Sequence, residues 1–70
     1  MEVAVQAQRQ LREWAAGRGV KLGWIAAAVP VGISALSRWL NGRGIPAAVY
    51  RHRLADISGI EDLREEGNWK

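Results

Sequence analysis

Residues 25–42 read IAAAVPVGISALSRWLNG and predict two short helices joined by a tight turn. Apolar residues recur at helical spacing on both sides of Val29-Pro30-Val31-Gly32. Pro30 lacks a backbone N–H and disfavours helical angles at the residue before it, so the first of these helices must end there. We expect the two helices to cross closely at the small side chain of Ala26.

This stretch lies inside a longer segment that contains no acidic residue. Residues 14–55 have no Asp or Glu, but they include the basic residues Arg18, Lys21, Arg38, Arg43, Arg51 and Arg53. Residues 1–53 carry a net charge of +6, from eight Lys or Arg and two Glu, whereas residues 54–70 carry −3, from two and five. This split is consistent with a surface that binds a polyanion and a separate acidic end. On charge alone, the ordinary solvated surface of a small basic protein explains it equally well.

The length and composition bound the class of protein. Seventy residues predict one domain, 1–70, with modest stability, because a chain this short buries only about 60% of its unfolded surface. There is no cysteine, and the single histidine, His52, has no evident catalytic partner, so we expect no enzyme activity, metal or cofactor. No apolar run approaches the roughly 20 residues that span a bilayer, and no signal segment is evident, which predicts a cytoplasmic protein without a membrane partner.

The pattern of apolar residues and helix terminators predicts an all-α fold of four to five helices. The expected ranges are 3–16, 22–28, 32–41 and 47–58, with one further turn in 60–66 and a loose end at about 67–70. Gly17 and Gly19 should end the first helix, and Gly59 the fourth. Pro46 suits the first position of the fourth helix.

Each helix is expected to bury one apolar stripe. The stripes comprise Ala7, Leu11, Trp14 and Ala15; Leu22, Ile25, Ala26 and Val29; Leu36, Trp39 and Leu40; and Ala47, Tyr50, Leu54 and Ile57. The spacing of Trp39 favours core packing over stacking on a base. Trp24 falls off its helix's stripe, so we expect it to be partly exposed.

The opposite side of the helix after the turn carries small polar groups and an arginine. Positions four apart on a helix share a side, which groups Ile33, Ser34, Ser37, Arg38 and Asn41. Such side chains suit the DNA major groove, which admits one helix and offers hydrogen-bonding base edges. Arg38 is more readily explained as a base reader than as a solvated residue, whereas Ser37 could equally bond a carbonyl of the preceding turn.

Several of these residues together resemble the Cro/CI-type, or XRE-like, helix-turn-helix family. The matching pieces are Ile25-Ala26, Val29, Val31, Leu36-Ser37-Arg38-Trp39-Leu40-Asn41-Gly42 and Pro46, and the tail LADISGIEDLR resembles small phage- or prophage-type regulators and their YdaS-like relatives. The resemblance covers about residues 11–66 and implies a compact lambda-repressor-like domain with its motif at about 22–41. Two positions depart from it: Pro30 replaces a usual glycine, and Leu22 replaces a glutamine that often contacts phosphate.

The resemblance implies a role for each side chain on this surface. Base contacts are implied for Ile33, Ser34, Ser37 and Arg38, and phosphate contacts for Arg18, Lys21, Asn41, Arg43 and Arg51. The implied function is a sequence-specific regulator of transcription that binds double-stranded DNA. We expect it to act as a repressor and as a homodimer on an inverted repeat, with half-sites about one helical turn apart.

Partners other than DNA are expected near the C-terminus. Candidates for the dimer contact are Ile57, Ile60, Leu63 and Trp69, and the acidic end is a candidate surface for RNA polymerase or another protein. The alternative function is a protein-interaction module on the same fold, such as an antitoxin or an adaptor.

Overall fold

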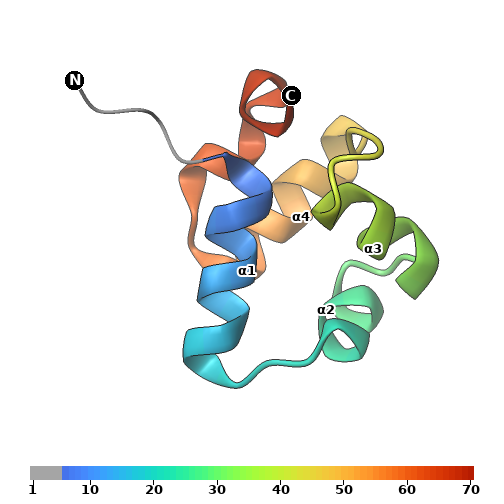
Figure 1. The fold of residues 1–70 in the computed structure, drawn as a ribbon, viewed down its shortest axis with the longest axis vertical. Coiled ribbons are helices and arrows are strands. Elements are labelled where there is room, and N and C mark those ends of the chain that lie inside the picture. Colours follow the sequence, from blue (N-terminus) through green and yellow to red (C-terminus); the bar gives the residue numbers. More distant parts are fainter. Residues whose placement is uncertain (1–5) are drawn as a thin grey trace.

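The computed structural model describes residues 6–70, which form an all-helical domain (Figure 1). The elements are α1 (Ala7–Arg18), α2 (Leu22–Ala28), α3 (Ile33–Leu40), α4 (Ala48–Ser58) and the 3-10 helices η1 (Glu61–Arg64) and η2 (Glu66–Trp69). No strand occurs in this part of the chain, so the all-α prediction is confirmed. The expected start of the first helix at residues 3–5 lies outside the described residues.

Each element contributes a fully buried side chain to one core. Leu11, Ile25, Leu36, Leu54 and Leu63 come from α1, α2, α3, α4 and η1 in turn, and all have no exposed surface. Trp14, Trp39, Tyr50 and Ile57 are half-buried and pack against this cluster. Two expected core residues, Leu22 and Ala47, are instead exposed, Leu22 by 38% of its surface. Leu22 is the first residue of its helix and Ala47 precedes α4, where neither side chain reaches the core.

Two of the three glycines that were predicted to end helices do so. Gly19 (φ 68°) and Gly59 (φ 76°) adopt the left-handed conformation and end α1 and α4. Gly17 does not end α1, which continues two residues beyond the expected range to Arg18. The expectation that Pro46 begins α4 is also wrong, because Pro46 is buried in the loop before the helix.

The segment that decides the fold forms the expected helix, turn and helix. The observed bounds of α2 match the prediction, and its axis is bent by 113° from that of α3. The turn places the amide of Val31 2.7 Å from the carbonyl oxygen of Ala26, and its Val29–Pro30 peptide bond is cis. No single helix in residues 6–70 is long and apolar enough to cross a membrane, and only α2 and α3 taken together reach that length, across this bend.

The C-terminal segment is docked, which corrects the expectation of a loose end. Trp69 is 2% exposed, and its indole N–H donates to the carbonyl of Leu63 at 2.9 Å. From the start of α1, the side-chain amide of Gln8 donates to the carbonyl of Trp69 at 2.7 Å, and that of Gln6 to the carbonyl of Lys70 at 3.1 Å. Figure 1 shows this end of the chain beside the start of α1. These long-range contacts make η2 part of the fold.

Candidate nucleic-acid interface

The helix α3 has one buried side and one exposed side. Leu36 is fully buried and Leu40 is 5% exposed, and together they fasten the helix to the core. Ser34 and Arg38 are exposed on the opposite side, and Ile33, in the first turn of the helix, is 54% exposed. Ser37 is only half-buried. The structure therefore brings the four predicted base-contacting residues onto one helix, with three of them open to a partner.

The C-terminus of α3 is closed by backbone hydrogen bonds. Gly42 adopts the left-handed conformation (φ 72°), and its amide donates to the carbonyl of Trp39 at 3.1 Å. The amide of Arg43 then reaches back to the carbonyl of Arg38 at 2.8 Å. These two bonds form a Schellman motif, which satisfies carbonyls that have no partner within the helix. The motif also fixes Arg43 directly beside the end of α3.

An arginine from α1 satisfies the remaining carbonyl at the end of α3. Arg12 donates to the carbonyl oxygen of Leu40 from Nη2 at 2.9 Å and from Nε at 3.2 Å. The same Nη2 lies 2.7 Å from Oδ1 of Asn41, whose Nδ2 donates to Oγ of Ser37 at 3.4 Å. Nothing in the local sequence indicates this role of Arg12, because the carbonyl that it meets is 28 positions away. A cation at a helix C-terminus also interacts favourably with the helix dipole.

Five exposed basic side chains near α2, α3 and α4 have no charged or hydrogen-bonding partner among the described residues. They are Arg18, Lys21, Arg38, Arg43 and Arg53. In residues 6–70, the four α-helices also lack a side-chain N-cap and an acidic residue in the first turn. Their N-terminal N–H groups therefore add uncompensated positive potential.

Comparison with known families decides the class of this domain. A family model described as a helix-turn-helix domain matches residues 9–67, most of the chain. The chain belongs to this helix-turn-helix family. The match supports a DNA-binding regulator, and the bend of 113° between α2 and α3 is typical of the motif. No curated protein and no solved structure matches the chain.

Arg51, which was predicted to contact phosphate, makes hydrogen bonds within this helix-turn-helix domain. Arg51 is half-buried, with Nε donating to the carbonyl of Arg64 at 3.1 Å and Nη1 to that of Pro46 at 2.8 Å. The guanidinium therefore ties the loop before α4 to η1. These bonds use two of the five N–H groups of Arg51, so the side chain has an internal role that the sequence did not indicate, and its phosphate contact stays a prediction.

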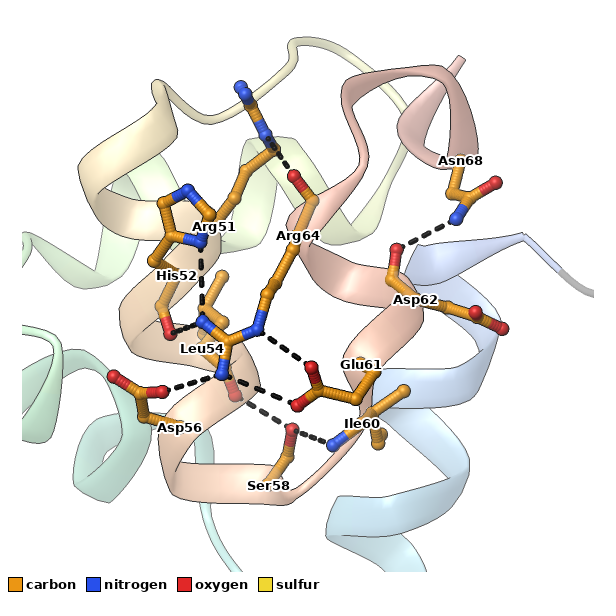
Figure 2. A network of polar contacts seen from close by, with 10 residues as sticks. All are labelled: Arg51, His52, Leu54, Asp56, Ser58, Ile60, Glu61, Asp62, Arg64 and Asn68. Carbon is orange, nitrogen blue, oxygen red and sulfur yellow. Dashed lines mark hydrogen bonds and ion pairs between the residues drawn. The ribbon is translucent and has the colours of Figure 1, made fainter.

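The acidic end of the chain is partly neutralised by its own arginine (Figure 2). Arg64 lies 2.7 Å from a carboxylate oxygen of Asp56 and 3.0 Å from one of Glu61. Its hydrogen bonds to Glu61 and then Asp56 raise the pKa of Arg64 above its usual value. Nη1 of Arg64 also lies 3.2 Å from Nδ1 of His52, which must accept this bond because arginine only donates. The hydrogen bonds of Arg51 and Arg64 in Figure 2 thus hold α4 against η1.

Two of the four residues predicted for a dimer contact lie in the core. Leu63 has no exposed surface and Trp69 is 2% exposed, so the prediction is wrong for both. Their side chains are buried against other residues of the same chain. Ile57 and Ile60 are half-buried and remain candidates.

The outward side of α2 is apolar, with Leu22 and Trp24 both exposed. Trp24 is 56% exposed and lines a surface hollow of about 470 Å³ with Gly19, Val20, Lys21 and Gly23. Leu22 borders a second hollow of about 520 Å³, which also contains Ser37 and Asn41. Within residues 6–70, no group of His, Cys, Asp or Glu side chains could hold a metal ion.

Proposed function

We propose that this helix-turn-helix protein is a sequence-specific regulator of transcription that reads double-stranded DNA with α3. The observation that carries the proposal is the two-sided structure of α3. Leu36 and Leu40 anchor one side, while Ser34 and Arg38 are exposed on the other and Ile33 is exposed at the first turn. A single helix fits the major groove, and residues near the start of a recognition helix contact base edges. Ile33 and Ser34 occupy that position in α3.

The basic side chains around α3 support binding to the DNA backbone. Arg43 follows the helix, Arg18 ends α1, and Lys21 precedes α2. These three cations have no charged partner among the described residues, so their charge is available to phosphates. Asn41 joins this set with its side chain already held by Arg12. Phosphate contacts of this kind set the register of the protein, whereas the exposed side of α3 sets sequence preference.

The mode of regulation that we propose follows the Cro/CI-type resemblance. The protein would be a phage- or prophage-type repressor that binds an inverted repeat as a homodimer and blocks a promoter. Half-sites would lie about one helical turn apart, because each α3 must enter the major groove on the same side of the duplex. Ile57 and Ile60 are the remaining candidates for the dimer contact, and the acidic end is a candidate surface for RNA polymerase or another protein.

Selection from a random duplex pool tests this function. The protein is incubated with the pool, bound duplexes are enriched over several rounds, and the size of the complex is then measured. We expect enrichment of an inverted repeat and a complex of two protein chains on one duplex. Failure to enrich any sequence would contradict the proposal.

The exposed apolar side of α2 favours a second candidate, the protein-interaction module. Trp24 and its neighbouring hollow offer an apolar surface of the kind that partner proteins cover. Salt dependence separates the two candidates. DNA binding through about four to six phosphates per chain predicts an affinity that falls with salt at a log–log slope of roughly −0.9 per contact. Binding to an apolar protein surface predicts a much weaker dependence on salt.

A further inference from the structure

We propose that Arg12 is a positioning residue that sets the sequence selectivity of α3 without touching a base. This inference rests on the proposed function, because it concerns how the reading side of α3 is held. Arg12 belongs to α1, yet its guanidinium ends at the C-terminus of α3. The chain of contacts runs from Arg12 to Asn41 and from Asn41 to Ser37.

The backbone carbonyls in the last turn of α3 have different hydrogen-bond donors. Backbone amides satisfy the carbonyls of Ser37, Arg38 and Trp39. In the described residues the carbonyl of Leu40 has no backbone donor, and Arg12 supplies two N–H groups to it. Removing Arg12 leaves that carbonyl without its partner and frees the Asn41 side chain, so the last turn of α3 is held only by the packing of Leu40.

Leu40 packs this turn of α3 into the core, and on the solvent side Arg12 borders two open hollows. One hollow, of about 380 Å³, is lined by Gln6, Gln8, Arg9, Arg12, Leu40, Asn41 and Gly42. The other, of about 520 Å³, shares Arg12, Leu40 and Asn41 with the first. On this outer side of the domain, the guanidinium therefore connects α1 to α3 beyond the buried core.

The same geometry limits how Arg12 could contact DNA directly. Nε and Nη2 of Arg12 are occupied by Leu40 and Asn41, and Nη2 serves both acceptors. A phosphate could reach Arg12 only through Nη1, whose two N–H groups have no partner among the described residues, and the bonds to Leu40 and Asn41 would stay in place. Arg9, one turn earlier on α1, provides a matched control because it is highly exposed and pairs only loosely with Glu13 at 3.8 Å.

The test compares Arg12→Met with Arg9→Met in the full chain. Both changes remove one positive charge from α1 and keep an aliphatic stem. Affinity is measured for the enriched duplex and for a scrambled duplex, and selectivity is their ratio. We expect Arg12→Met to lower selectivity about tenfold, the order of one lost base discrimination, and Arg9→Met to leave it unchanged. On the scrambled duplex the two variants should bind alike.

Asn41→Ala provides the coupling measurement and a safeguard against misfolding. If Arg12 acts through Asn41, Arg12→Met should change selectivity less than about twofold in the Asn41→Ala background. Should Arg12→Met fail to fold, Asn41→Ala alone must still reduce selectivity, and unchanged selectivity would overturn the proposal. The side-chain amide resonance of Asn41 should shift in Arg12→Met and not in Arg9→Met, which is a readout without DNA.

The possible failures can be told apart. Unchanged selectivity in Arg12→Met, with the Asn41 resonance shifted, overturns the positioning role and leaves the proposed function intact. A salt dependence reduced by about one contact, with equal losses on both duplexes, makes Arg12 a phosphate contact instead. If the unaltered protein enriches no duplex, the proposed function fails, and the positioning role of Arg12 fails with it.

Discussion

The backbone amide of Arg43 donates to the carbonyl of Arg38 at 2.8 Å, so one hydrogen bond joins the two arginines at the end of α3. Arg38 is still within the helix, on its exposed side, and Arg43 has just left it. The two residues are thus neighbours in space, one within the helix and one in the loop that follows it. We assign base reading to the first and phosphate binding to the second, and the two roles predict different responses to mutation.

Arg38→Ala should weaken binding to the enriched duplex by about 1–3 kcal/mol and relax preference at the base pair that it contacts. The reason is the loss of a charged donor from the exposed side of α3. Titration of each variant against enriched and scrambled duplexes measures the effect. Equal losses on the two duplexes would assign Arg38 to the backbone instead.

Arg43→Ala should weaken binding to both duplexes to a similar extent. A phosphate contact carries no sequence information, but its loss should reduce the magnitude of the log–log salt slope by about 1. Affinity measured over a series of salt concentrations tests this expectation. A loss confined to the enriched duplex would show that Arg43 reads sequence.

Gly42→Ala should destabilise the fold by about 1–2 kcal/mol. No atom lies within 4 Å of the position that a Cβ would take at Gly42, so the cost comes from its φ of 72°. Gly17→Ala is the matched control, because Gly17 has equally open space and lies inside α1. That change should stabilise by about 0.5–1 kcal/mol. Urea unfolding of both variants measures the difference, and a stabilising Gly42→Ala would refute the account of this helix end.

Trp69→Ala should destabilise the protein by about 3–5 kcal/mol, which is a large part of the stability of a small domain. The indole is buried and donates to the carbonyl of Leu63, so truncation leaves both a cavity and an unpaired carbonyl. Trp24→Ala, on the exposed side of α2, should change stability by less than about 0.5 kcal/mol. Thermal unfolding followed by circular dichroism compares the two. Similar melting temperatures for both variants would contradict the docked C-terminus.

Local sequence chemistry was sufficient to predict the helix-turn-helix segment. Pro30 ended α2 and the spacing of Leu36 and Leu40 identified the buried side of α3, because these effects act within a few residues. Gly59 ended α4 for the same kind of reason. The order of elements from α1 to α4 followed from such signals alone.

Contacts between distant residues could not be predicted in this way. The placement of Trp69 depends on Gln8, which is 61 positions away, and Arg12 meets a carbonyl 28 positions away. Arg51 looked like a free cation because its acceptors are backbone carbonyls, which every residue has. A composition of charged and apolar residues carries no information about which carbonyl such a side chain will find.

The division of α3 into an anchored and an open side has a consequence for how this protein can change. Leu36 and Leu40 hold the helix to the core, whereas Ile33, Ser34 and Arg38 contribute little to that packing. Substitutions at these three positions should therefore alter which operator is chosen while the melting temperature stays nearly constant. The domain is accordingly a scaffold on which recognition can diverge, or be redesigned, independently of folding.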